Sequence, residues 1–139
     1  MATDRERNGY VSLVLVSHSA SIAEGVAELV AQVAGSDVPI VAIGGGPDGT
    51  LGTDGAKVLE ALRSAASGTG AVVLMDLGSS VLAVRAALEE LSEEDRSRLE
   101  IADAPLVEGA LAAGVTASIG GSAGEVARAA EEARSVRKL

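Results

Sequence analysis

Four short runs of β-branched and aliphatic residues alternate along this chain with longer amphipathic segments. The runs cover residues 10–16, 38–44, 71–78 and 99–104, and each has the length of a strand. The segments between them carry apolar residues at the three- and four-residue spacing of a helix. Parallel strands need a crossover connection, which a helix usually supplies, so this alternation predicts a parallel sheet. We expect an α/β fold, a small doubly wound sheet of about four parallel strands with helices on both faces.

Helices are predicted over residues 21–35, 54–66, 79–91 and 105–118, with a final helix from 122 to about 137. Three of the expected starts carry residues that cap helices or turns: Ser21 with Glu24 and Ser122 with Glu125 match the capping box, and Asp54 is a good N-cap. Ser92 with Asp95 predicts a short capped turn before the last strand. In the first helix the apolar positions at helical spacing are Ile22, Val26, Leu29, Val30 and Val33.

Composition limits the classes of function that need consideration. The 139 residues suffice for one domain, predicted over residues 10–139 behind a disordered leader at 1–9. A net charge of −9 with scattered basic residues disfavours nucleic acid as a partner, and the single aromatic residue, Tyr10, offers no surface for stacking bases. Without cysteine there is no thiol catalysis and no thiolate zinc site, and we find no other metal cluster. No apolar segment is long enough to span a bilayer, and the polar N-terminus does not resemble a signal peptide, so we expect a soluble cytoplasmic protein.

The carboxyl ends of the predicted strands bring four polar or glycine-rich segments to one edge of the sheet. These are residues 17–21, 44–55, 76–80 and 104–109. Ligands of open α/β sheets bind at this edge, near the point where the strand order reverses. The side chains there that carry chemistry are His18, Thr53, Asp76, Ser79 and Ser80.

His18 is the only histidine, and it lies between a strand and a helix. The positive end of a helix dipole attracts phosphate and favours the neutral, nucleophilic imidazole. Asp76 follows another strand and is the expected acceptor for the ring N–H, which would fix the tautomer and stabilise the charge that develops during attack. The alternative is a purely structural, hydrogen-bonded histidine. The residues alone leave both interpretations open.

Two further segments also have two interpretations each. The loop at residues 44–55 is rich in glycine and either cradles phosphate or is a flexible surface loop, but it contains neither a P-loop lysine nor a dinucleotide-binding fingerprint. Ser79 and Ser80 either cap the third long helix or contribute to an anion pocket. No nucleophile elbow surrounds them, and the arginine that precedes the histidine of histidine phosphatases is here Ser17.

Four motifs in order carry a resemblance to a known family. They read LVLVSHSASIAEGV, LGTDGAKVLEAL, VLMDLGSSVLAV and APLVEGALAAGV, and the resemblance spans residues 11–134. The sequence resembles the DhaM phosphotransferase subunits of phosphoenolpyruvate-dependent dihydroxyacetone kinases, whose domain has the mannose-type enzyme IIA fold.

The resemblance implies a role for each matching residue. His18 would be the phosphorylated histidine and Asp76 the residue that orients it. The phosphate pocket would be lined by Ser19, Gly52, Thr53, Gly78, Ser79 and Ser80.

The resemblance also implies partners and a place in glycerol metabolism. HPr would donate the phosphoryl group, and the DhaL subunit would accept it on bound ADP, so that ATP and magnesium belong to DhaL and this chain holds no cofactor or metal. DhaK, which binds dihydroxyacetone, would be an indirect partner. Proteins of this kind are typically homodimers, and a chain of this length would use separate phosphoryl donors. Two alternatives remain: an enzyme IIA that serves a sugar transporter, and a non-catalytic binding module.

Overall fold

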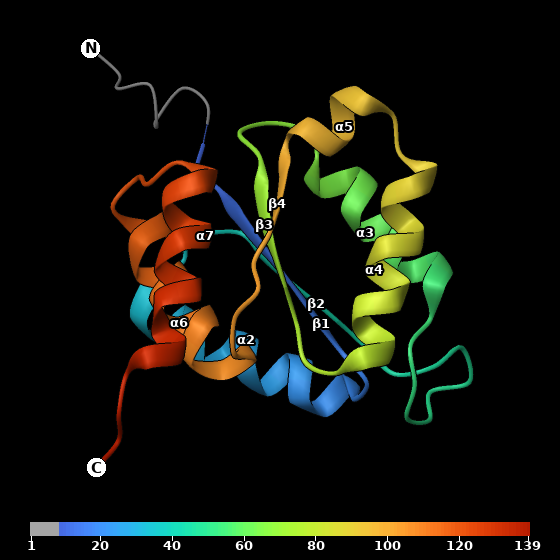
Figure 1. Ribbon diagram of the computed structural model, residues 1–139, viewed down its shortest axis with the longest axis horizontal. Coiled ribbons are helices and arrows are strands. Elements are labelled where there is room, and N and C mark those ends of the chain that lie inside the picture. Colours follow the sequence, from blue (N-terminus) through green and yellow to red (C-terminus); the bar gives the residue numbers. More distant parts are fainter. Residues whose placement is uncertain (1–8) are drawn as a thin grey trace.

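The computed structural model describes residues 9–139, so the predicted leader lies outside the described residues except for Gly9. Four strands form one sheet in the order β2-β1-β3-β4 (Figure 1). Every neighbouring pair is parallel. The strands are β1 (Ser12–Ser17), β2 (Ile40–Gly44), β3 (Ala71–Met75) and β4 (Leu99–Ile101). The prediction of about four parallel strands in an α/β fold is confirmed.

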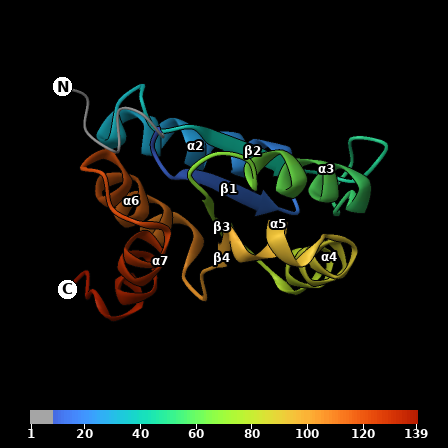
Figure 2. The same cartoon turned by 90° about the horizontal axis from the view of Figure 1, so that it is seen from above.

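Helices cover both faces of the sheet. On one face lie α2 (Ala20–Ala34), α6 (Leu106–Ser118) and α7 (Ala123–Glu132), and on the other lie α3 (Gly55–Ala65) and α4 (Gly78–Glu90). Figures 1 and 2 show α6 and α7 on the opposite side of the sheet from α3 and α4. The short helix α5 (Glu93–Ser97) precedes β4, and a 3-10 turn η1 (Ala133–Ser135) follows α7. No helix within residues 9–139 is both long and apolar enough to cross a membrane.

The two central strands are apolar along their length because both of their faces are buried. Successive side chains of a strand point to opposite faces. In β1, Leu13 and Leu15 therefore pack under α2, α6 and α7, whereas Val14 and Val16 pack under α3 and α4. Each of these four side chains has no exposed surface. Such continuous apolar runs are typical of parallel sheets covered on both sides.

The predicted start of the first helix is wrong by one residue, and the capping box of Ser21 with Glu24 is not formed. The helix α2 begins at Ala20, and Ser19 is its N-cap, with an extended backbone and a side chain that accepts a hydrogen bond from the Ile22 amide at 3.3 Å. The strand before it ends at Ser17, so the chain is already positioned to enter the helix at Ser19. The caps predicted at Asp54, Ser92 and Ser122 are confirmed, the last as a full capping box with Glu125.

Candidate active site

The site lies where the carboxyl ends of the two central strands meet. His18 directly follows β1, and Asp76 directly follows β3, its hydrogen-bonded neighbour. The Asp76 amide continues the ladder by donating to the Val16 carbonyl at 3.1 Å. The sheet order reverses at β1, with β2 on one side and β3 on the other. The topological switch point, where ligands of such folds bind, therefore places the imidazole and the carboxylate in contact.

The Asp76 carboxylate accepts five hydrogen bonds. At Oδ2 it accepts from the Ser17 hydroxyl at 2.7 Å and from the His18 amide at 3.0 Å. At Oδ1 it accepts from the Ser80 hydroxyl and the Leu77 amide, both at 2.7 Å, and from His18 Nδ1 at 3.1 Å. Such a set of donors fixes both the position and the orientation of the carboxylate.

These donors also keep Asp76 ionised. Burial, which leaves 12% of the side chain exposed, by itself raises the pKa of a carboxyl group. The hydrogen bonds from Ser17, Ser80 and His18 outweigh burial and hold the pKa of Asp76 well below its usual range. At neutral pH the site therefore contains a fixed negative charge beside the imidazole.

That charge determines which of the two imidazole nitrogens carries the ring proton. A carboxylate only accepts hydrogen bonds, so the ring proton lies on Nδ1, and Nε2 carries the lone pair. Nε2 faces the hydroxyl of Ser79, which is in contact with it, and Thr53 Oγ1 lies 3.1 Å from that hydroxyl oxygen. A quarter of the His18 side chain, 26%, is exposed. The imidazole is thus partly exposed, and its Nε2 lies beside small hydroxyl residues.

Neither of the two serines caps α4, so the capping interpretation is wrong. The N-cap is Leu77, and no side chain makes a cap hydrogen bond there. Ser79 and Ser80 lie in the first helical turn, where one points to His18 Nε2 and the other is fully buried against Asp76. The first turn of α4 thus supplies side chains to both ends of the imidazole–carboxylate pair.

The glycine-rich loop is attached to the site and is not simply a surface loop. The Gly52 amide donates to the His18 carbonyl at 2.9 Å, and Gly45 forms a parallel bridge with Thr53. At its start the backbone passes so close to α2 that a side chain on Gly44 would lie 2.4 Å from the Ser19 carbonyl oxygen. These contacts hold Thr53 against the hydroxyl of Ser79.

The remaining predicted positions are distributed around this cluster. The Ser19 hydroxyl caps α2, its amide donates to Ser17 Oγ at 3.1 Å, and Gly78 is the first residue of α4. The segment 104–109 contributes no hydrogen bond to the cluster among the described residues. A Cβ on its Gly109 would lie 3.2 Å from the Leu74 side chain, so this segment packs beneath the sheet edge. Of the four segments expected at the edge, three converge on His18.

Sequence reasoning missed Ser17, which has no exposed surface and bridges Asp76 and Ser19. A buried hydroxyl needs a hydrogen-bond partner. A serine as the last residue of an otherwise apolar strand, directly before the only histidine, is the signal that could have identified it.

Comparison with known proteins identifies the family of the chain. Residues 12–127 match the family described as the PTS system fructose IIA component. The chain therefore belongs to this family of phosphotransferase-system components.

The named relatives are more specific. The phosphoryl donor subunit DhaM of the PEP-dependent dihydroxyacetone kinase of Escherichia coli is 45% identical over 113 residues, which are 79% of this chain and 24% of that protein. DhaM of kinase 2 of Listeria innocua is 39% identical over 105 residues, 76% of this chain and 84% of that protein. The resemblance to DhaM is confirmed, although the chain spans only about a quarter of the Escherichia coli relative.

Two solved structures share the fold. A crystal structure of a protein of unknown function matches with a TM-score of 0.79 and 32% identity, covering 88% of this chain and 93% of that one. A sigma-54 interaction domain protein from Enterococcus faecalis matches with a TM-score of 0.67 at 17% identity, which shows the fold alone.

Proposed function

We propose that His18 accepts a phosphoryl group on Nε2 and passes it on, so that the chain is the phosphoryl donor of a dihydroxyacetone kinase. The observation that carries this proposal is the 3.1 Å contact of His18 Nδ1 with the ionised Asp76 carboxylate, which leaves the Nε2 lone pair available. A structural histidine does not need an ionised carboxylate at Nδ1 together with a second ring nitrogen that faces small hydroxyl residues.

The transfer is a displacement at phosphorus. The Nε2 lone pair forms the new N–P bond while the bond from phosphorus to the donor's leaving nitrogen breaks, and the electron pair stays with that nitrogen. The imidazole gains a positive charge, which the Asp76 carboxylate stabilises through Nδ1–H. In the next step the N–P bond breaks as an acceptor oxygen attacks, and His18 returns to its neutral form. Phosphoryl transfer depends mostly on positioning and charge stabilisation, which this cluster supplies.

The phosphoryl oxygens need hydrogen-bond donors, and the hydroxyls of Ser79 and Thr53 are the side chains nearest to Nε2. Both belong to the pocket that the family resemblance implies. In that pocket the Gly52 amide donates to the His18 carbonyl and the Ser80 hydroxyl to Asp76, so these two hold the site together. Direct contact with the phosphoryl group is therefore assigned to Ser79 and Thr53.

The proposal includes the partners that DhaM proteins imply. HPr is the donor, ADP on DhaL is the acceptor with its magnesium, DhaK is served indirectly, and the relay works in the cytoplasm as a homodimer. The relatives are named phosphoryl donor subunits of dihydroxyacetone kinases, which supports the donor role, and the individual partners follow from the resemblance to DhaM.

The surface next to the site suits protein partners. Leu51, Leu77 and Leu82 expose 79%, 62% and 66% of their surface. Leu51 precedes the Gly52 amide bonded to His18, Leu77 follows Asp76, and Leu82 lies one helical turn beyond Ser79. Exposed apolar side chains beside a reactive group favour contact with the apolar surface of another protein.

The second candidate is an enzyme IIA that serves a sugar transporter, because the family to which the chain belongs is described as the PTS system fructose IIA component. The same His18 chemistry would serve either acceptor. Their separation therefore needs an assay of the acceptor.

The test is a two-stage transfer. The chain is incubated with phosphoenolpyruvate, enzyme I and HPr, purified, and then mixed with DhaL carrying ADP. We expect one acid-labile, base-stable phosphoryl group on wild type, none on His18→Ala, and formation of ATP on DhaL. Phosphorylation of His18 without transfer to ADP would assign the chain to a transporter, and no phosphorylation of His18 would exclude both candidates.

A further inference from the structure

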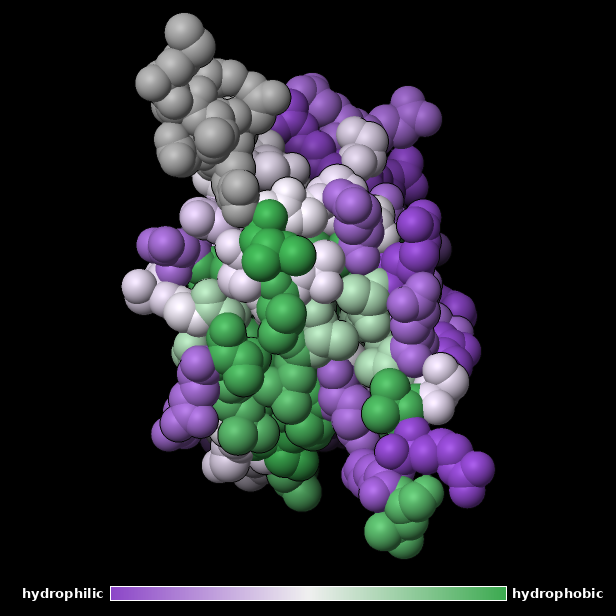
Figure 3. Space-filling model, turned by 90° about the vertical axis from the view of Figure 1, so that its left-hand side faces the viewer, coloured by the Kyte–Doolittle hydropathy of each residue, from purple (hydrophilic) through white to green (hydrophobic). Residues whose placement is uncertain are grey.

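Ser17 carries a buried hydroxyl that takes no direct part in the displacement at phosphorus. It is the last residue of β1 and has no exposed surface. Its side chain lies on the same face of the strand as Leu13 and Leu15, because residues two apart in a strand share a face. That layer is apolar, and hydrophobic side chains extend to the outer surface on this side of the molecule (Figure 3). A hydroxyl buried there is unfavourable unless it is hydrogen-bonded.

The register of the sheet places Ser17 beside Asp76. On one side Ser17 pairs with Gly44 of β2, which has no side chain. On the other side Val16 pairs with Met75, the last residue of β3, so Ser17 lies opposite Asp76. Opposite residues of neighbouring parallel strands point to the same face of the sheet. The carboxylate is therefore the side chain that the register brings to the Ser17 hydroxyl.

The two hydrogen bonds of this hydroxyl can form in only one direction. A serine hydroxyl has one proton to donate and lone pairs that accept. The Ser19 amide, 3.1 Å from Ser17 Oγ, can only donate, so the hydroxyl accepts there. Its single proton is directed to Asp76 Oδ2 at 2.7 Å, because a carboxylate only accepts. Ser19 is the N-cap of α2, so the entry into this helix fixes the direction in which Ser17 donates.

The bond from Ser17 makes the carboxylate a weaker base. Burial by itself raises the pKa of Asp76, and among the hydrogen bonds that lower this pKa the one from Ser17 is the largest. Ser17 and the His18 amide donate to Oδ2, whereas His18 Nδ1 donates to Oδ1. A hydrogen bond to the charged form of an acid stabilises that form over the protonated one. The carboxylate consequently holds the Nδ1 proton without removing it from the ring.

The location of that proton determines how easily the N–P bond of phosphorylated His18 breaks. With the proton on Nδ1, the electron pair of the breaking bond returns to Nε2 and the leaving group is a neutral imidazole. With the proton on Asp76, the leaving group would be an imidazolate anion, which is a much stronger base and leaves more slowly. The Ser17 hydroxyl disfavours the second arrangement because it stabilises the ionised carboxylate.

Ser17 acts on the histidine through Asp76. The Ser80 hydroxyl also donates to Asp76, but it lies 3.3 Å from His18 Nδ1 as well, so its removal would disturb the imidazole directly. Among the described residues, the hydrogen bonds of the Ser17 hydroxyl join Asp76 and Ser19 and do not reach the imidazole. Its removal therefore isolates the effect of the carboxylate.

We propose that Ser17 is a positioning residue for phosphoryl transfer, whose hydroxyl holds the Asp76 carboxylate so that the ring proton of phosphorylated His18 stays on Nδ1. The proposal rests on the proposed function, because it concerns how the phosphoryl group leaves His18. It adds a residue that never touches the phosphoryl group and still sets the rate at which that group moves on.

The test removes the hydroxyl and measures transfer out of His18. Wild type, Ser17→Ala, Ser17→Thr and Ser12→Ala are phosphorylated with phosphoenolpyruvate, enzyme I and HPr, purified, and mixed with excess unphosphorylated HPr in a single turnover. Ser12 is the matched control, because its hydroxyl donates to the Gly70 carbonyl at the opposite end of β1. We expect Ser17→Ala to transfer on the order of tenfold more slowly, the effect of losing one hydrogen bond to a charged group. Ser12→Ala should match wild type, and Ser17→Thr, which keeps the hydroxyl, should transfer faster than Ser17→Ala.

The ¹⁵N NMR spectrum of the phosphorylated imidazole gives a readout that a loss of stability alone would not change. Nδ1 of wild type should show one-bond coupling to its proton, and the Nδ1 signal of Ser17→Ala should move toward that of a deprotonated nitrogen as the proton shifts to Asp76. Thermal unfolding establishes that each variant is folded. If Ser17→Ala does not fold, Ser17→Cys takes its place, because a thiol has a similar volume and donates only weakly.

A phosphorylated wild type without a proton on Nδ1 would overturn the proposal and requires no variant. Transfer by the folded Ser17→Ala or Ser17→Cys within about twofold of wild type, a small fraction of the effect of one hydrogen bond, would also overturn it. Both results leave the proposed function intact, because His18 is phosphorylated in each. Absence of a phosphoryl group on wild-type His18 would overturn the proposed function and this proposal with it.

Discussion

The carboxylate of Asp76 should be needed for its charge and its pattern of hydrogen bonds rather than for its volume, and Asp76→Asn tests this. In wild type one oxygen accepts from Ser17 and the His18 amide, and the other accepts from Leu77, Ser80 and His18 Nδ1. The side-chain amide of asparagine replaces one of the two acceptor oxygens by an NH₂ group, which only donates. In either orientation its NH₂ group faces a backbone N–H, and the negative charge beside the imidazole is lost.

The expected loss is 10²–10⁴-fold in the rate of phosphoryl transfer, the range for removing a group that handles a proton or charge in the transition state. That corresponds to about 3–5 kcal/mol in the activation barrier. When the NH₂ group faces Nδ1, the ring proton moves to Nε2 and removes the lone pair that attacks phosphorus. In the other orientation the developing imidazolium has no anion to stabilise it.

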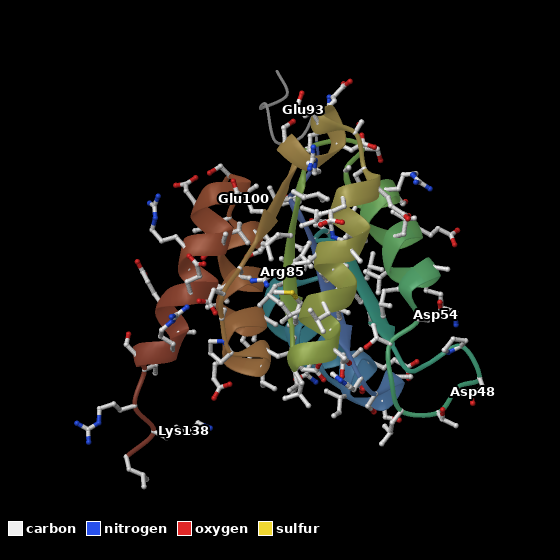
Figure 4. The ribbon with its side chains drawn as sticks, turned by 45° about the vertical axis from the view of Figure 1, so that its right-hand side comes forward. Asp48, Asp54, Arg85, Glu93, Glu100 and Lys138 are labelled. Carbon is white, nitrogen blue, oxygen red and sulfur yellow. The ribbon has the colours of Figure 1, made fainter. Side chains whose placement is uncertain are left out.

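The assay is rapid quench of the transfer from phosphorylated HPr, combined with ¹⁵N NMR of the imidazole to identify the protonated nitrogen. Asp48→Asn is the matched control, because Asp48 lies in the glycine-rich loop (Figure 4) and accepts a hydrogen bond from the Thr50 hydroxyl rather than from the histidine. Wild type should carry its ring proton on Nδ1. A rate within threefold of wild type for Asp76→Asn, with the fold intact, would refute the role assigned to the carboxylate.

Three further outcomes are expected. Ser79→Ala removes the hydroxyl at Nε2 and should slow phosphoryl transfer about tenfold, the effect of losing one hydrogen bond in the transition state. An unchanged transfer rate in the rapid-quench assay would contradict this. Gly44→Ala places a Cβ 2.4 Å from the Ser19 carbonyl and should cost about 1–3 kcal/mol of stability in thermal unfolding, whereas Gly124→Ala, with no atom within 4 Å, should cost none. Because the folded-state pKa of Asp76 is depressed, its contribution to stability is present above the unfolded value of about 3.9 and is lost as pH falls below it. The free energy of unfolding in urea, measured from pH 7 to 2.5, should therefore fall more steeply for wild type than for Asp76→Asn. Parallel pH dependences of the two proteins would contradict the lowered pKa of Asp76.

The fold was predictable because its signals are local. Continuous apolar runs indicated strands that are buried on both faces. Serine or aspartate followed by helical periodicity indicated the helix starts at Asp54, Ser92 and Ser122. The start of α2 was not predictable in the same way, since three serines alternate near it. The strand ends at Ser17, whose hydroxyl donates to Asp76, a residue 59 positions away in the sequence, and no local pattern indicates that contact.

The site was predictable in its outline and not in its detail. Strand ends in a parallel sheet meet at one edge, so His18 and Asp76 could be paired from their positions alone. The different roles of Ser79 and Ser80 depend on the rotation of the first turn of α4, which the sequence does not specify. The exposure of Leu29 and Val33 on α2 was not predictable for a similar reason. Periodicity shows that a helix has an apolar side, but the part of that side which stays exposed depends on where the neighbouring helices pack.

The most direct measurement for the central claim is NMR of the phosphorylated chain, with ³¹P and ¹⁵N detected on the imidazole of its only histidine. A phosphoryl group on Nε2 and a proton on Nδ1, held by the carboxylate of Asp76, is the predicted result. Phosphate on Nδ1, or on any residue other than His18, would contradict it.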